Sequence, residues 1–241
     1  MKHIIFLFIT SNIIFCQDEK KYDKSEIWEP EVKIVNPYGF NGVPDDAIIL
    51  FDGRDFSKWK SERNNQEVLW LLNADKSMTI KPGTGGIQTI EEHGSIQLHI
   101  EWKSPTKIKG DGQYRGNSGI FFQRRYELQI LDSYENRTYS NGQAGSIYKQ
   151  HIPLVNVTLP PGKWQKFDIV FNAPKLDDKG DEIKKGNFTI FHNGVLIHNG
   201  IEIISATYDF ESDTPFTLLL QDHGRDEGNY ISFRNIWMRK L

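Results

Sequence analysis

The chain has 241 residues, a formal net charge of -3 and a hydrophobic fraction of 38%. The near-neutral charge excludes the strongly basic surface that marks nucleic-acid-binding proteins. The length suits one large all-β domain as well as two small domains, and an aromatic fraction of 12% favours β structure.

The N-terminus, residues 1–16, is typical of a secretory signal peptide. Lys2 and His3 precede an apolar run over residues 4–9, and polar residues 10–12 interrupt this run. A transmembrane helix needs about 20 apolar residues, so we expect no membrane span here. The sequence therefore predicts an exported protein, either periplasmic or extracellular.

Cys16, the only cysteine, lies at the expected cleavage site. A lipoprotein with Cys16 as the lipidated residue is the alternative, and the bulky Phe15 directly before it argues against that alternative. With no second cysteine the mature domain forms no internal disulfide, so its core has to be large enough alone. Residues 17–44 predict a leader and connector, and residues 45–241 predict the folded domain.

Alternating apolar and polar residues between turn signals predict about ten strands. In the clearest one, apolar side chains alternate from Ile96 to Trp102 and face inward, while the polar residues between them face outward. Asn193-Gly194 predicts a hairpin turn. The predicted strand and hairpin segments, in chain order, are residues 48–59, 68–80, 95–103, 120–131, 164–172, 187–199, 217–224 and 230–241.

No long stretch keeps helical spacing between caps. Strands without helical crossovers predict an all-β antiparallel sandwich or barrel. The long loops favour a double-sheet jelly roll, in which one sheet curves and its concave face makes a groove.

The polar side of residues 116–132 is the first candidate site. Glu127 and Gln129 point away from their apolar neighbours, and Asp132 follows at the end of the strand. A core strand carries Glu and Gln on one face only where that face is wet or each group is paired. This face is therefore either an exposed sheet surface or the floor of a cleft in which two carboxylates divide acid and base roles.

Two further segments carry candidate site residues. Gln221 and His223 share a face of the predicted strand 217–224, where His223 is a candidate general base, and a histidine that caps the strand end is the alternative. Arg234 lies on an otherwise apolar strand, which indicates a paired or ligand-facing charge. An ion pair of Arg234 with Glu101 or Glu127 explains it equally well.

His99 and Glu101 form a candidate metal pair, because they lie two residues apart on an outward face. No third ligand has diagnostic spacing. The sequence therefore predicts no metal or other cofactor, with a divalent metal as the alternative.

Glu127-x-Gln129-x-x-Asp132 is similar to the Glu-x-Asp-x-x-Glu strand motif of laminarinase-type glycosidases, which also use a jelly roll. The chain has an amide at the central carboxylate and a shorter Asp at the last Glu. These departures disfavour a double-displacement mechanism.

Beyond these single motifs, the chain resembles the 3-keto-disaccharide hydrolase domain family over most of residues 45–241. The matching pieces are LFDGRDFSKW (50–59), QLHIEWKSP (97–105), GQYRGNSGIFFQRRYELQILDSYENRTY (112–139), AGSIY (144–148), PPGKWQKFDIVFNAP (160–174), FHNGVLIHN (191–199), LLQDHG (219–224) and FRNIWMRKL (233–241).

The resemblance implies a concanavalin-like jelly roll that acts on sugars already oxidised at C3 by a partner sugar 3-dehydrogenase. The mechanism expected from carbonyl chemistry is removal of the C2 proton, elimination of the C1 substituent and hydration. It needs a base, a cation or donor near the C3 oxygen, and a proton source for the leaving oxygen. It needs no double-displacement carboxylate pair.

The chemistry suggests a role for each candidate residue. Glu127 or His223 is the expected base, Arg234 or Lys149 the expected enolate stabiliser, and Asp132 the expected proton source. The expected sugar-binding residues are Glu101, Gln129, Gln221, Lys149, Tyr148, Asn117 and Arg124, of which Arg124 stands where the family commonly has Gly and is expected to narrow one edge of the cleft.

Two other functions remain open on the sequence. A non-catalytic carbohydrate-binding module is the first, because jelly rolls often bind glycans without chemistry. It predicts a flat row of exposed Trp or Tyr, whereas the enzyme predicts that Glu127, Gln129, Gln221, His223 and Arg234 converge in one pocket. A laminarinase-type glycosidase is the second, and it predicts cleavage of unoxidised glucans.

Overall fold

The computed structural model of the protein describes residues 25–178, 182–208, 214–224 and 230–241. The chain divides into two compact units, Met1–Val35 and Asn36–Leu241. The predicted signal peptide, residues 1–16, lies outside the described residues. Within the described ranges the structure has no helix of the length and hydropathy needed to cross a bilayer.

The larger of two main sheets has eight strands. Seven of them follow the order β13-β12-β9-β6-β15-β4-β3, and β1 also pairs with β15. The strands of this sheet are β1 (Ile48–Phe51), β3 (Leu71–Leu72), β4 (Met78–Thr79), β6 (Ile96–Lys103), β9 (Gln165–Asn172), β12 (Asn187–His192), β13 (Val195–Glu202) and β15 (Ser232–Lys240).

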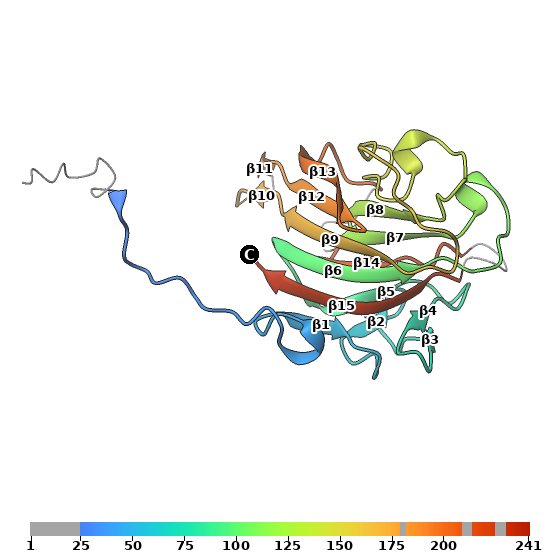
Figure 1. The fold of residues 1–241 in the computed structure, drawn as a ribbon, viewed down its shortest axis with the longest axis horizontal. Helices are drawn as coiled ribbons and strands as arrows, with labels where there is room; N and C mark the ends of the chain where they lie inside the picture. Colours follow the sequence, from blue (N-terminus) through green and yellow to red (C-terminus); the bar gives the residue numbers. More distant parts are fainter. Residues whose placement is uncertain (1–24, 179–181, 209–213, 225–229) are drawn as a thin grey trace, which may run out of the picture. The chain divides into compact units, whose positions relative to one another are not determined.

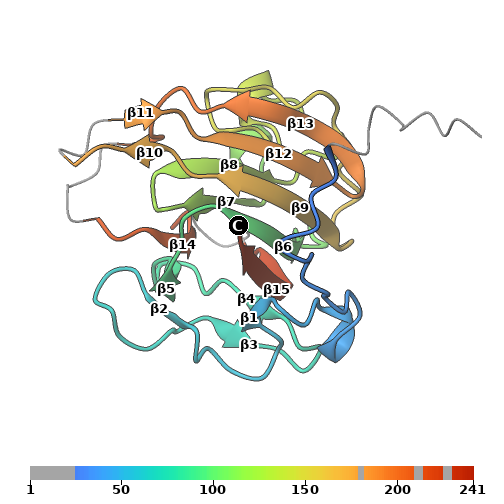
Figure 2. The same cartoon turned by 90° about the vertical axis from the view of Figure 1, so that its left-hand side faces the viewer.

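The second main sheet has five strands in the order β2-β5-β14-β7-β8. Its strands are β2 (Trp59–Ser61), β5 (Ile87–Glu92), β7 (Asn117–Phe122), β8 (Tyr126–Leu131) and β14 (Thr217–Leu220). The short strands β10 (Lys175–Leu176) and β11 (Glu182–Lys184) pair with each other. Short 3-10 turns are η2 (Phe40–Gly42), η3 (Gly112–Tyr114) and η4 (Ser140–Gly142). All the strand pairs that the structure describes are antiparallel, and Figures 1 and 2 show the two main sheets as separate layers.

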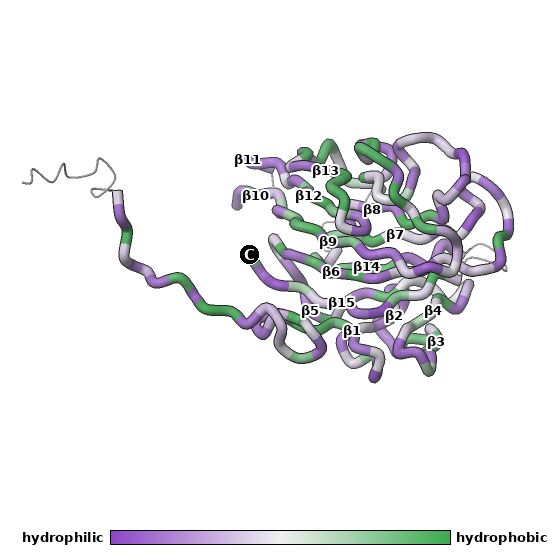
Figure 3. The backbone as a smooth tube through the Cα atoms, in the orientation of Figure 1, coloured by the Kyte–Doolittle hydropathy of each residue, from purple (hydrophilic) through white to green (hydrophobic). Residues whose placement is uncertain are grey.

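The core lies between the two sheets. As predicted, the apolar residues of β6 from Ile96 to Trp102 point into it and are fully buried. Ile120, Phe122 and Leu128 of the five-stranded sheet belong to the same apolar cluster. Hydrophobic and hydrophilic residues alternate along β6 and β12 in Figure 3, because each strand has one face on this core. The predicted antiparallel double-sheet jelly roll is confirmed.

Both hairpins predicted from turn residues are present. Asn193 and Gly194 have φ angles of 53° and 81°, as a two-residue turn with two left-handed positions requires. The hairpin expected around Asn73 joins β3 to β4. The structure differs from the predicted segments in two places: β10 and β11 lie outside them, and β14 ends at Leu220 although the predicted segment extends to residue 224.

Candidate functional site

Glu127 and Gln129 lie on the outer face of the five-stranded sheet. They alternate along β8 with Leu128 and Ile130, which belong to the core. Although they face away from the core, Glu127 is only 2% exposed and Gln129 only 1%. Of the two alternatives for this polar face, the exposed sheet surface is therefore excluded.

The segment after η4 extends the sheet beyond β8. The backbone N–H of Gln129 donates to the carbonyl of Ser146 at 2.9 Å, and the N–H of Tyr148 donates to the carbonyl of Glu127 at 3.0 Å. At the same edge of β8, the N–H of Glu127 donates to Thr207 Oγ1 at 3.0 Å. Two segments far from β8 in sequence thus meet at Glu127 and help bury it.

Gly119 of β7 makes room for the Glu127 side chain. It pairs with Gln129 across the β7–β8 ladder, and the pair of Phe121 with Glu127 lies two residues further along each strand. A Cβ atom on Gly119 would lie only 2.6 Å from Glu127 Oε1. Any larger residue at this position would therefore displace the carboxyl group.

Three buried side-chain oxygens on this face have no hydrogen-bond partner among the described residues: Glu127 Oε2, Gln129 Oε1 and Gln221 Oε1. Gln221 lies in the same row as Gln129, because its N–H donates to the carbonyl of Gly119 at 3.0 Å. Buried polar atoms are normally paired, and an unpaired cluster indicates a site for polar ligand atoms or water.

A polar network holds the Gln129 side chain in place. Its Nε2 donates to Gln113 Oε1 at 3.0 Å and to Asn117 Oδ1 at 3.4 Å. Asn117 in turn donates to the carbonyl of Gln113 at 2.8 Å. Because the amide nitrogen of Gln129 is engaged, its oxygen is the atom left available to a ligand. The structure thus brings the predicted residues Asn117, Gln129, Gln221 and Glu127 together.

Tyrosines and one lysine gather at Glu127. The hydroxyl groups of Tyr139 and Tyr148 are 2.6 Å apart, and Tyr208 stacks on Phe121 with ring centroids 6.0 Å apart. Lys149 Nζ lies 5.4 Å from the centroid of the Tyr148 ring. Tyr148 and Lys149 were predicted from the sequence. Tyr139 and Tyr208 were missed, because no local pattern ties either of them to β8.

Burial dominates the electrostatics of this cluster. It raises the pKa of Glu127 to about 8, against the opposing charge of Lys149. Burial and then the charge of Glu127 raise the pKa of Tyr208 to about 12, and burial followed by the hydrogen bond with Tyr148 raises the pKa of Tyr139. Glu127 is therefore mostly protonated at pH 7 and ionises near pH 8, close to the working range of a general acid or base.

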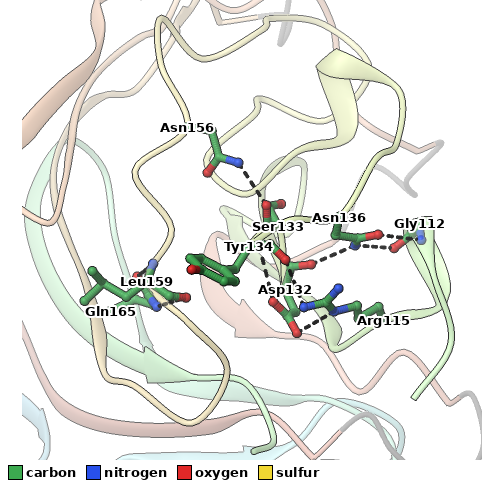
Figure 4. A network of polar contacts seen from close by, with 9 residues as sticks. All are labelled: Gly112, Arg115, Asp132, Ser133, Tyr134, Asn136, Asn156, Leu159 and Gln165. Carbon is green, nitrogen blue, oxygen red and sulfur yellow. Dashed lines mark hydrogen bonds and ion pairs between the residues drawn. The ribbon is translucent and has the colours of Figure 1, made fainter. Parts of the chain in front are cut away.

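Asp132 lies in a separate, fully paired network (Figure 4). Its Oδ2 accepts a hydrogen bond from Arg115 Nε at 2.7 Å, and its Oδ1 accepts one from the N–H of Tyr134 at 3.4 Å. The Asp132 side chain is 2% exposed. This ion pair disfavours Asp132 as the proton source for the leaving group, because its carboxylate binds Arg115 and the turn after β8. It also removes the second carboxylate of a laminarinase-type pair.

Arg234 lies with Glu101 on the other sheet, so it does not converge with Glu127 in one pocket, and the alternative of an ion pair with Glu101 is present. They face each other across the β15–β6 ladder, and Arg234 Nε donates to Glu101 Oε2 at 2.6 Å. Glu101 alternates along β6 with Ile100 and Trp102 of the core, so it points outward from the eight-stranded sheet. Both sheets and the core therefore separate this pair from Glu127.

The two remaining predicted residues lie at the margins of the five-stranded sheet. His223 is half-buried two residues beyond Gln221, in a segment held by Asp222, whose Oδ2 accepts the N–H of Gly85 at 3.0 Å. Arg124 Nη1 donates to Gln88 Oε1 at 3.1 Å. Gln88 is three strands from Glu127 along the sheet, or about 14 Å. The structure therefore does not bring Arg124 to Glu127.

The candidate metal pair has no suitable third ligand among the described residues. His99 Nε2 lies 3.8 Å from Glu101 Oε1, while His99 Nδ1 makes a 2.6 Å contact with Asp168. Among the described residues, no group of three His, Cys, Asp or Glu side chains is arranged to hold a metal ion.

Comparisons with known proteins identify the family and support the fold. Residues 46–239 match the model of the 3-keto-alpha-glucoside-1,2-lyase-like domain. A crystal structure of a candidate glycosyl hydrolase from Parabacteroides distasonis is 41% identical, with a TM-score of 0.82, over 91% of this chain and 96% of that one. A second candidate glycosyl hydrolase from the same organism is 19% identical, with a TM-score of 0.60, over 81% and 94% of the two chains, and shares the fold. No curated protein sequence matches. The chain therefore belongs to the 3-keto-alpha-glucoside-1,2-lyase-like domain family, which indicates a carbohydrate-active, glycosyl-hydrolase-like protein.

Proposed function

We propose that the protein cleaves the glycosidic bond of 3-keto-glycosides by elimination and hydration. The observation that carries this proposal is the buried carboxyl group of Glu127, whose pKa is raised to about 8 and whose Oε2 has no hydrogen-bond partner among the residues that the structure describes. A double displacement at C1 needs two carboxyl groups about 5–5.5 Å apart. Here Asp132 is paired with Arg115, so Glu127 has no second carboxyl group to act with it. A single carboxyl group with a raised pKa suits proton abstraction.

The chemistry follows from the ketone. A carbonyl group at C3 acidifies the hydrogen on C2, and a base that takes this proton leaves an enolate. The enolate re-forms the carbonyl group, expels the C1 substituent and leaves a double bond between C1 and C2. The leaving oxygen takes up a proton, and water then adds across the enone at C1 and C2. The net reaction is hydrolysis to the 3-keto sugar and the freed alcohol.

The cluster at Glu127 contains a group for each step. Ionised Glu127 is the proposed base, and Lys149, the nearby cation, is the proposed partner of the enolate oxygen. The hydroxyl group of Tyr148, hydrogen-bonded to Tyr139, is the proposed proton source for the leaving oxygen. Gln129 and Gln221 offer their unpartnered oxygens to sugar hydroxyl groups.

His223 is the competing candidate for the base, because it lies two residues beyond Gln221, whose N–H donates to the carbonyl of Gly119. Proton abstraction by either residue makes the C2 hydrogen of a 3-keto-glycoside exchange with solvent deuterium. Glu127→Gln removes this exchange if Glu127 is the base, and His223→Ala removes it if His223 is the base.

The proposal includes the cellular context. The signal-like residues 1–16 support export to the periplasm or the outside. A 3-keto substrate has to be made by oxidation of a glycoside at C3, so a sugar 3-dehydrogenase is the proposed functional partner.

The decisive experiment incubates the purified protein with 3-keto-trehalose, 3-keto-lactose and their unoxidised parents, with and without a chelator. We expect cleavage of the 3-keto sugars only, and loss of this cleavage in Glu127→Gln. Lys166→Ala, an exposed change on the outer face of the other sheet, is the matched control and retains activity. Full turnover in both Glu127→Gln and His223→Ala contradicts the proposed site.

Exposed tyrosines favour a non-catalytic carbohydrate-binding module as the second candidate function. Tyr208 is 57% exposed and Tyr139 is 41% exposed, and such rings stack on sugars. This candidate predicts saturable binding of the same sugars without cleavage. Release of sugar from the unoxidised parents would instead support an ordinary glycosidase.

A further inference from the structure

The outer face of the eight-stranded sheet carries a cavity that the proposed reaction does not use. Its volume is about 320 Å³, at the lower end of the roughly 300–1,000 Å³ of small-molecule sites. The residues that matter here are Asp52, Asp75, Glu101, Arg234, Asn235 and Trp237. Glu101 and Arg234 are the two predicted site residues that the structure separates from Glu127.

A bulge in β15 builds the polar wall of this cavity. Neighbouring residues of a regular strand point to opposite faces, but the register of β15 on β6 shifts between Arg234 and Trp237. Asn235 has a left-handed φ of 47° at this shift. As a result Asn235 Nδ2 donates to Glu101 Oε1 at 3.0 Å while Arg234 Nε donates to Glu101 Oε2 at 2.6 Å. β-Bulges are common next to active sites, where the extra residue changes the direction of a side chain.

Glu101 orients the guanidinium group of Arg234. Burial disfavours the charged carboxylate, but the contact with His99 and the hydrogen bonds from Asn235 and Arg234 together lower the pKa of Glu101 to about 2. The ionised carboxylate holds Arg234 by its Nε edge, and the Arg234 Cζ atom lies 4.1 Å from the centroid of the Trp164 ring. The two Nη groups of Arg234 have no hydrogen-bond acceptor among the described residues, so they are available to a ligand in the cavity.

An apolar wall lies beside these donors. Trp237 lines the cavity and is held on one face by His99, with ring centroids 5.3 Å apart and an interplanar angle of 10°. Ile49 and Phe51 of β1 line the cavity next to it. Oriented polar groups beside an aromatic ring match a sugar, which has hydroxyl groups on its rim and C–H groups on its faces.

The charged side chains around the cavity indicate which class of polar ligand it favours. Three carboxylates line the cavity, from Asp52, Asp75 and Glu101, and two cations, from Lys76 and Arg234. The formal charge is therefore negative, which disfavours an anion, and no group of three metal-ligating side chains occurs among the described residues. A neutral hydroxylated ligand carries neither penalty.

We propose that this cavity is a second, non-catalytic site that binds a neutral sugar unit on the sheet face opposite to Glu127. The site goes beyond the proposed reaction and does not depend on it. Its size suits one or two sugar rings. Such a site holds a sugar or glycan on the protein without placing it at the catalytic cluster.

The test follows the indole N–H resonance of Trp237 by NMR, assigned with Trp237→Phe, during titration of the full-length folded protein with methyl α-D-glucopyranoside, trehalose and lactose. We expect a saturable shift in the millimolar range for at least one of these sugars, and none with glucuronate. Because this readout is local, sugar bound at Glu127 does not produce it, and the Glu127→Gln variant shows the same shift.

Arg234→Lys separates binding from a structural ion pair. Lysine keeps the charge opposite Glu101 but loses the Nη donors, so we expect binding weakened about tenfold, the loss of one good hydrogen bond, with the melting temperature nearly unchanged. Lys166→Ala, opposite Glu101 on β9 but outside the cavity, is the control with unchanged binding.

Two results would overturn the proposal. A Trp237 resonance that does not shift with any neutral sugar shows that the cavity is not a sugar site, and this titration needs no variant to fold. Equal affinity in Arg234→Lys and the wild type shows that the guanidinium group binds no ligand.

Discussion

The raised pKa of Glu127 makes a prediction about stability that needs no substrate. Glu127 has a pKa of about 8 in the folded protein, against 4.5 for an unperturbed glutamate side chain. A raised folded-state pKa means that the unfolded chain ionises first, so folding stability is fully present below pH 4.5 and falls as the pH rises to 8. Each pKa unit corresponds to about 1.4 kcal/mol, so the loss is about 3 kcal/mol at pH 7 and about 5 kcal/mol above pH 8.

Glu127→Gln removes this titration. We expect the stability of the variant to rise relative to the wild type by about 4 kcal/mol between pH 4.5 and pH 8.5, or about 8–16 °C in melting temperature for a domain of this size. Burying the amide of the Glu127→Gln variant has a cost that does not depend on pH, so this cost cancels when the stability difference at one pH is compared with that at another. The assay is urea or thermal unfolding of both proteins across this range.

Glu202→Gln is the matched control, because Glu202 is exposed on β13. We expect no pH-dependent difference between this variant and the wild type. A Glu127→Gln difference that stays flat from pH 4.5 to pH 8.5 would refute the reasoning, because it would mean that Glu127 has an ordinary pKa and is solvated in the folded protein.

Three further predictions concern activity and packing. If ionised Glu127 is the base, kcat/KM for a 3-keto-disaccharide rises with pH and levels off above about pH 8; a fall through the same pH range would identify Glu127 as an acid. Asp132→Asn leaves Arg115 buried without its charged partner, so we expect the free energy of unfolding, measured with urea, to fall by about 3–5 kcal/mol. An unchanged unfolding midpoint would show that the ion pair does not stabilise the fold. Arg124 has a left-handed φ of 56° at a hairpin turn, a conformation that glycine adopts without strain. We therefore expect Arg124→Gly to leave the melting temperature unchanged or higher, although the hydrogen bond to Gln88 is lost. A clear fall in melting temperature would show that this hydrogen bond outweighs the strain.

Much of the sandwich could be predicted from local patterns. Alternation from Ile96 to Trp102 identified the buried face of β6, because successive side chains of a strand point to opposite faces. Asn193-Gly194 identified its hairpin, because these residues adopt left-handed φ angles readily. The same alternation placed Glu127 and Gln129 together on one outward face.

Alternation identifies the side of a strand that faces outward, but the two main sheets have two outer faces. Arg234 and Glu101 lie on one and Glu127 lies on the other, because strand order depends on pairing between distant segments. The burial that raises the pKa of Glu127 likewise depends on contacts from Tyr148 and Thr207, which meet at β8 only in the folded chain. The residue pattern therefore identified the polar strand, whereas tertiary packing determined which side chains from other segments surround the buried carboxyl group of Glu127.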